Sequence, residues 1–120
     1  MYLRTFNMAK NNFIGKWRIL EMSAWDKDYF DEEVPAHIKL EKNLRGNFHF
    51  GYVQGQIDGE IGKRSDGEYF EFTFDGSDNG GGDDVSGSGW IKLRDDNHAE
   101  GEIKFYLGDD STFQLKRIKK

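Results

Sequence analysis

The sequence has no cysteine, which excludes a disulfide framework, a thiolate metal site and a cysteine nucleophile. It has no apolar run near the roughly 20 residues that span a bilayer. Its opening segment, MYLRTFNMAKNN, lacks the continuous apolar stretch of a secretory signal. We therefore expect a cytoplasmic protein without membrane contact, whose stability comes from packing.

Positive charge is in the minority. The chain carries 17 Lys and Arg against 22 Asp and Glu, a net charge of −5. This balance disfavours a phosphate backbone as partner, so we expect no nucleic-acid binding. The length of 120 residues fits one domain. We expect residues 1–12 to form a loose arm, with Met1 or Met8 as the start, and residues 13–120 to form a single domain.

Proline occurs once, whereas glycine occurs 15 times and aromatic residues make up 15% of the chain. This balance is typical of short strands joined by tight turns. Alternation with a period of two predicts about eight strands. Their ranges are 16–23, 36–41, 46–54, 56–64, 68–75, 88–94, 99–107 and 112–118. The segments KNLRG, RSDGE, LRDDNHAEG and LGDDS supply turn residues between them.

One connection is too long for a tight turn. In AWDKDYFDEEVP, Asp26 is placed to cap a short helix that Pro35 ends. We expect this to be the only helix.

Each predicted strand has one apolar face. The inward series are Phe48, Phe50 and Tyr52; Ile57 and Ile61; Phe70, Phe72 and Phe74; Ile91 and Leu93; Ile103, Phe105 and Leu107; and Phe113 and Leu115. With no helices to cover such a sheet, it closes on itself or splits into a sandwich. Sequential hairpins favour an all-β, eight-stranded, antiparallel up-and-down barrel, whose interior is either filled or holds one small ligand.

The first predicted strand and its connection resemble the start of the calycins, the superfamily of lipocalins, fatty-acid-binding proteins and avidins. Gly15 and Trp17 match the Gly-x-Trp of the first strand, and Trp25 with Asp26 resembles the aromatic-acidic pair before a helical lid. The chain is also similar to small bacterial proteins with calycin-like sequences, through Gly15-x-Trp17-Arg18, Ser86-Gly-Ser-Gly89-Trp90 and Leu107-Gly-Asp-Asp-Ser111.

The calycin resemblance implies a role for the last strand. The chain has neither the Thr-Asp-Tyr of lipocalins nor the Arg-x-Tyr with which fatty-acid-binding proteins hold a carboxylate. In lipocalins an arginine near the end of the last strand packs over the first-strand tryptophan. Arg117 could do this for Trp17 through a cation–π contact, or it could anchor a ligand.

The glycine-rich segment from Asp75 to Ser86 resembles a calcium loop in its spacing of oxygen-bearing side chains, but Ser86 stands where a bidentate Glu is expected. We expect a glycine-rich hairpin loop there and leave calcium binding open. The triple glycine lacks the Lys-Ser/Thr of a phosphate loop. His37, His49 and His98 are scattered. We expect no metal and no cofactor.

No residue stands out as catalytic. Glu71, Glu100 and Glu102 lie on the polar faces of predicted strands, where solvation is the ordinary state of a carboxylate. No serine lies in a strand-turn-helix elbow. Four aromatic residues, Trp25, Tyr69, Trp90 and Tyr106, fall outside the apolar faces and could form an interface, for example in a homodimer. The alternative is that Trp25 and its helix fold over the other three within one chain.

Three functions stay open. The first is the non-catalytic binding of a small apolar molecule inside the barrel, by Phe50, Tyr52, Phe72, Phe105, Phe113 and Arg117. The second is a protein-interaction module or homodimer that uses the outer aromatic residues. The third is an enzyme on a calycin scaffold, which requires a polar group with a perturbed pKa inside a pocket.

Overall fold

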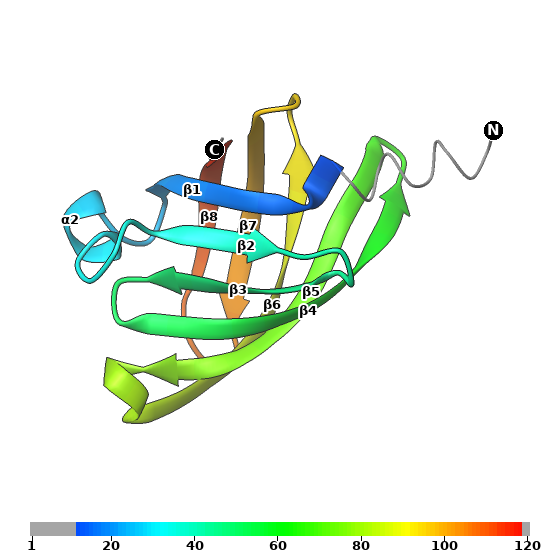
Figure 1. Cartoon of the computed structure of the whole chain (residues 1–120). Helices are drawn as coiled ribbons and strands as arrows, with labels where there is room; N and C mark the ends of the chain where they lie inside the picture. Colours follow the sequence, from blue (N-terminus) through cyan, green and yellow to red (C-terminus); the bar gives the residue numbers. More distant parts are fainter. Residues whose placement is uncertain (1–11, 119–120) are drawn as a thin grey trace.

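Each strand pairs with the next one along the chain, and the last strand pairs with the first, which closes a barrel (Figure 1). The structure is a computed structural model that describes residues 12–118. The strands are β1 (Gly15–Met22), β2 (His37–Leu40), β3 (Arg45–Phe50), β4 (Val53–Arg64), β5 (Gly67–Asp78), β6 (Asp83–Leu93), β7 (His98–Phe105) and β8 (Asp110–Arg117). The helical parts of the described chain are α2 (Lys27–Phe30), the 3₁₀ turn η1 (Asn79–Gly81) and residues Asn12 and Phe13 before β1, so α2 is not the only helical segment. The all-β up-and-down barrel with a short α-helix after the first strand is confirmed.

The expected arm over residues 1–12 lies, apart from Asn12, outside the described residues. Within residues 12–118, the helices are all too short and too polar to cross a bilayer.

The turn between β3 and β4 comes earlier than the sequence predicts. It lies at Gly51 and Tyr52, so Gln54 belongs to β4. Gly51 has a φ of +56°, which favours glycine, and a Cβ there would strike the ring of Tyr29 in α2. Tyr52 therefore leaves the inward series that contains Phe48 and Phe50. The expected inward position of Leu107 is also wrong, because the chain turns after β7 and leaves this side chain 89% exposed.

Phenylalanine rings fill the barrel by lying over inward-facing glycines. Eight phenylalanines are buried. A Cβ added at any of five glycines would collide with a ring from a neighbouring strand. These pairs are Gly55 with Phe48, Gly59 with Phe70, Gly87 with Phe74, Gly89 with Phe72, and Gly101 with Phe113. The rings therefore occupy the space that glycine side chains leave, and they replace the packing that those residues lack.

Little empty space remains inside. The interior void measures about 10 Å³, and a cavity of that size holds at most about one water molecule. Its lining residues are Ile19, Met22, Ile38, Phe48, Phe50, Phe72, Ile103 and Phe113. The barrel is of the filled kind.

Helix α2 covers one end of the barrel. The side chain of Asp26 accepts a hydrogen bond from the Tyr29 amide at 3.2 Å, as expected for its cap. Asp31, just after the helix, accepts from Arg18 of β1 at 2.6 and 2.9 Å and from the Ala36 amide at 2.8 Å. These hydrogen bonds hold the pKa of Asp31 well below its usual range, with the Arg18 bonds as the largest cause.

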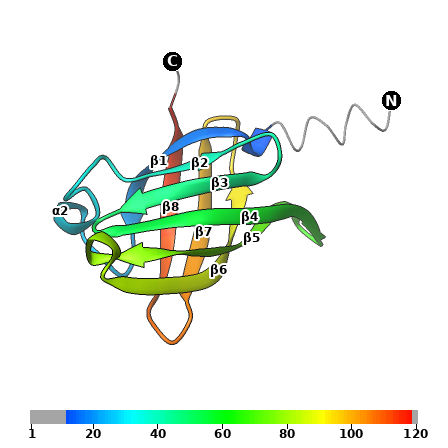
Figure 2. The ribbon, with the colours of Figure 1, turned by 60° about the horizontal axis from the view of Figure 1, so that its bottom comes forward.

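The glycine-rich segment continues the sheet instead of forming a loop. The ladder between β5 and β6 runs on to Asp78 opposite Asp83, and only η1 turns the chain. Asp75 faces Ser86 across this ladder, so the oxygens of the calcium-like pattern are spread along two strands. In Figures 1 and 2, η1 lies at the same end of the barrel as α2.

We expect Gly101→Ala to lower the free energy of unfolding by about 1–3 kcal/mol, the usual cost of overpacking a core. A Cβ at this position would lie 2.5 Å from the Phe113 ring and closer still to the Trp90 carbonyl. Urea unfolding measures the change. Gly82→Ala, where the Cβ would meet nothing nearer than 3.4 Å, is the control and should change stability by less than about 0.5 kcal/mol. Equal effects of both variants would contradict the packing role of the inward glycines.

We expect Asp31→Asn to lower stability at pH 7 by about 1–2 kcal/mol, through the loss of hydrogen bonds to a charged group. Because folding lowers the pKa of Asp31, its stabilisation is complete above the unfolded value of about 3.9 and is lost as pH falls towards the folded value. Urea unfolding between about pH 6 and pH 2 should therefore show the wild type converging on the variant in acid. The exposed Asp28→Asn on the same helix is the control. A difference that stays constant over this range would be evidence against the ion pair.

Candidate functional site

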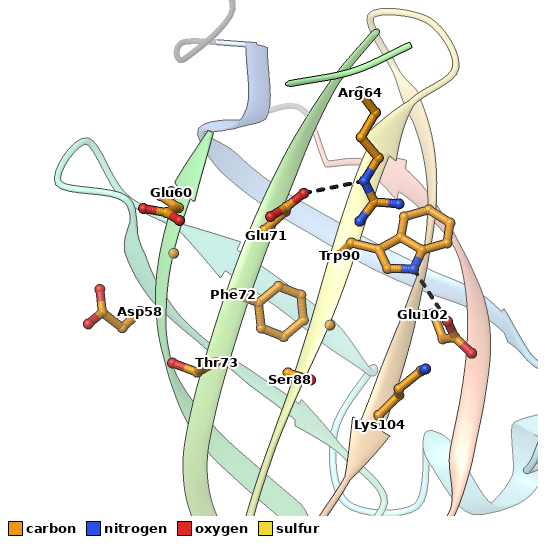
Figure 3. A pocket seen from close by; sticks show the side chains of 12 residues that line it. Asp58, Glu60, Arg64, Glu71, Phe72, Thr73, Ser88, Trp90, Glu102 and Lys104 are labelled. Atoms are coloured by element: carbon orange, nitrogen blue, oxygen red, sulfur yellow. Dashed lines mark hydrogen bonds and ion pairs between the residues drawn. The ribbon is translucent and has the colours of Figure 1, made fainter. Parts of the chain in front are cut away.

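A large hollow of the described surface lies outside the barrel, over β4 to β7 (Figure 3). We call it the outer groove. Its volume is about 670 Å³. Its lining residues are Asp58, Gly59, Glu60, Arg64, Glu71, Phe72, Thr73, Ser88, Gly89, Trp90, Glu102 and Lys104. They come from four adjacent strands, and the pairing of these strands places them together.

One row of the outer groove alternates acids with a tryptophan. Cross-strand pairing sets Glu60 opposite Glu71, Glu71 opposite Trp90, and Trp90 opposite Glu102. The Trp90 indole N–H donates to Glu102 Oε1 at 3.3 Å. Directly opposed like charges are destabilising in a sheet. The Glu60 and Glu71 pair is therefore a place where a cation would be favoured.

The floor of the outer groove is made of small side chains. Thr73 and Ser88 lie opposite each other in the next row, with Asp58 and Lys104 at its two ends. Because both hydroxyl side chains are short and their neighbours are long, the surface is hollow between them. The floor therefore offers hydroxyl donors and acceptors, within a rim of charged groups.

Arg64 and Tyr69 pack together at the end of the outer groove that lies near the β4–β5 turn. The Arg64 guanidinium lies 4.0 Å from the centre of the Tyr69 ring, and its Nε is 3.3 Å from Glu71 Oε2. Tyr69 donates its hydroxyl to Asp66 at 2.8 Å, which raises the pKa of the tyrosine, and Lys92 donates to the same carboxylate oxygen. Tyr69 is only 7% exposed. Its ring supports Trp90 from the side, with ring centroids 5.4 Å apart.

A second hollow of about 530 Å³ continues the outer groove towards the β7–β8 turn. It shares Thr73, Ser88 and Lys104 with the first and ends at Tyr106, which is 73% exposed. Of the four aromatic residues expected at an interface, Trp90 and Tyr106 thus line one continuous outer surface. Tyr69 is buried beside them.

Trp25 lies elsewhere, at the end of the barrel that α2 covers. Its indole packs on Phe50 at 5.2 Å, on Phe105 at 6.1 Å and on Tyr29 at 6.2 Å between ring centroids. It is half-buried and closes the mouth of the barrel together with the helix. The structure therefore separates Trp25 from the outer aromatic residues.

The residues expected to bind an apolar ligand are divided among three places. Phe50, Phe72 and Phe113 are buried in the filled interior, and Phe105 is half-buried beneath Trp25. Tyr52 lies in the β3–β4 turn, where its ring contacts Tyr29 with centroids 6.2 Å apart. Binding of a small apolar molecule by this set stays a prediction, and it would require packed rings to move.

Arg117 lies at the opposite end of the barrel from α2. Its guanidinium carbon is 4.3 Å from the centre of the Trp17 ring. Its side chain donates to the carbonyls of Asp96 at 2.8 Å, Ile14 at 2.8 Å and Asn12. Burial lowers the pKa of this arginine. The side chain thus ties β8 to the segment before β1. Of the two roles that the sequence left open for Arg117, this contact with Trp17 matches the structural one.

Two histidines that the sequence leaves scattered meet on the outer face of β2 and β3. His37 lies opposite His49, with ring centroids 6.3 Å apart. The Nε2 atom of His49 is 3.0 Å from Glu33 Oε1, and burial lowers the pKa of His37. Within residues 12–118, no three His, Asp or Glu side chains come close enough together to hold a metal ion.

Sequence reasoning missed most of the outer groove. Alternation placed the acids of the polar faces outside, but it did not identify Asp58, Glu60, Thr73, Ser88 or Lys104 as neighbours. Their proximity depends on the register between strands, which no single strand encodes. The one usable pattern was a tryptophan on an otherwise polar face, at Trp90.

No protein-family model, no curated protein and no solved structure matches the chain. The site is therefore interpreted from its own geometry.

We expect Arg117→Lys to lower the free energy of unfolding by about 1–3 kcal/mol, because lysine keeps the charge but cannot donate to several carbonyls while stacking on Trp17. Chemical unfolding followed by tryptophan fluorescence measures this. Lys116→Ala, at an exposed neighbouring position of β8, should leave stability within about 0.5 kcal/mol of the wild type. If Arg117→Lys is as stable as the wild type, the arginine does not hold the end of the barrel closed.

Proposed function

We propose that this protein is a non-catalytic binding module that engages a partner protein through the outer groove. The observation that carries the proposal is the location of empty space. The interior void is about 10 Å³, whereas the outer groove measures about 670 Å³. Of these two spaces, only the outer groove has the size of a ligand site.

The contents of the outer groove also suit a protein surface. Trp90 is half-buried and Tyr106 is exposed, and both residue types are common at interfaces. Around them stand charged side chains and the two hydroxyls of the floor. An aromatic anchor within a polar rim is the usual anatomy of a protein–protein interface.

The fold agrees with this use. Closure of the eight strands is compatible with the calycin resemblance of the first strand, and we infer membership of that superfamily from the two together. Calycins that carry small ligands keep their barrel open inside, whereas here rings, the Trp25 lid and Arg117 occupy the interior and both ends. A filled barrel leaves its outer face for binding.

Photo-crosslinking in the cells that produce the protein tests the proposal. Replacement of Tyr106 by p-benzoylphenylalanine puts an aromatic crosslinker at the rim of the outer groove. We expect adducts of discrete mass that disappear when Trp90→Ala is added. The same crosslinker at Lys39, an exposed position on β2, should give none of these adducts.

The mass of the adduct identifies the kind of partner. A mass of two chains assigns the outer groove to a homodimer, and a larger or smaller adduct assigns it to another protein. Absence of adducts from position 106, or adducts that are unchanged by Trp90→Ala, would overturn the proposal. Circular dichroism of Trp90→Ala checks that the barrel remains folded.

A further inference from the structure

The outer groove has an excess of negative charge. Its lining includes four carboxylates, of Asp58, Glu60, Glu71 and Glu102, and two basic side chains, of Arg64 and Lys104. The chain as a whole has a net charge of −5. A cationic partner is therefore attracted to this face, and an anionic one is repelled.

Basic side chains in and near the outer groove neutralise only part of its negative charge. Arg64 is engaged with Glu71 and stacked on Tyr69. The contact between Arg45 and Asp58 is 4.0 Å long and exposed, so it is weak. Glu60, an exposed side chain, faces Glu71 directly. An additional cation between these two carboxylates would remove their repulsion.

Trp90 adds a surface that attracts cations. Figure 3 shows its indole broadly facing the viewer, who looks onto the outer side of the sheet, between the side chains of Arg64 and Glu102. The Arg64 guanidinium carbon already lies 5.8 Å from the ring centre. An aromatic face flanked by carboxylates provides cation–π attraction and charge pairing at one place.

We propose that the outer groove binds a lysine- or arginine-bearing segment of a partner protein, with basic side chains over Trp90 and beside the carboxylates of Glu60 and Glu71. The hydroxyls of Thr73 and Ser88 on the floor are then available to the polar backbone of that segment. A neutral partner would leave the Glu60 and Glu71 repulsion in place. This inference rests on the proposed function, since it names the chemistry of the partner at the same groove.

Titration with peptides, followed by amide NMR, tests the charge preference. The main probe is a capped pentapeptide with Lys and Arg at its second and fourth positions. Two control peptides carry Gln or Glu at those positions. Maltohexaose tests whether the outer groove binds a saccharide instead. The indole N–H of Trp90 is a direct reporter, and that of Trp17, buried on the Phe13 carbonyl at 3.0 Å, is an internal reference.

We expect the basic peptide to shift the Trp90 indole and the amides of Glu71, Thr73 and Ser88. Its affinity should fall as salt rises from about 20 to 300 mM, because salt screens exposed charges. The double variant Glu60→Gln/Glu71→Gln should weaken binding about five- to tenfold, the sum of two exposed charge pairs. Glu32→Gln/Glu41→Gln, with the same change in charge away from the outer groove, should have less than about a twofold effect.

Each other result overturns the inference. Equal binding of the Gln or Glu peptide excludes a charge preference, and shifts outside the outer groove exclude the site. Absence of binding by the basic peptide at low salt also overturns the inference. The proposed function fails separately, when the crosslinker at position 106 gives no adduct that depends on Trp90. Binding of maltohexaose in the outer groove would contradict both, because it assigns the groove to a saccharide.

Discussion

The structure depends on phenylalanine rings that lie over inward-facing glycines. A closed barrel of eight strands leaves an interior that side chains can fill or that can hold a small ligand. Here the rings reach across to neighbouring strands and occupy the space where glycine has no side chain, as Phe72 does at Gly89. Each contact between a ring and a glycine packs two neighbouring strands together. It also uses up the space that an apolar ligand would need, so these contacts produce a filled core.

Side chains also close both ends of the barrel. At one end Trp25 covers Phe50 and Phe105, and Asp31 fastens the short helix to Arg18 of β1. At the other end Arg117 stacks on Trp17 and donates to backbone carbonyls. These residues close and stabilise both ends of the structure. The hollow surface then lies on the outside, where Trp90 stands among carboxylates.

Prediction from the sequence was most successful where the decisive contact is local. The period of two assigned Phe70, Phe72 and Phe74 to one face, because successive side chains of any strand point in opposite directions. Asp26 was recognised as a helix cap because its partner, the Tyr29 amide, is three residues away. The β3–β4 turn was misplaced because its position depends on Gly51 packing beneath Tyr29, which is far away in the sequence. The outer groove was missed for the same reason, since Glu60, Glu71, Trp90 and Glu102 come from four strands.

The sequence by itself determined the number of the strands, most of their faces, the short α-helix after the first strand and the acidic character of the surface. These properties arise from residues within a few positions of one another and from composition. The tertiary structure alone decided that the interior is filled, that Arg117 holds the base of the barrel, and that Trp90 stands in a row of carboxylates. Those outcomes depend on register, and register is fixed by which side chains of distant strands fit together when the barrel closes.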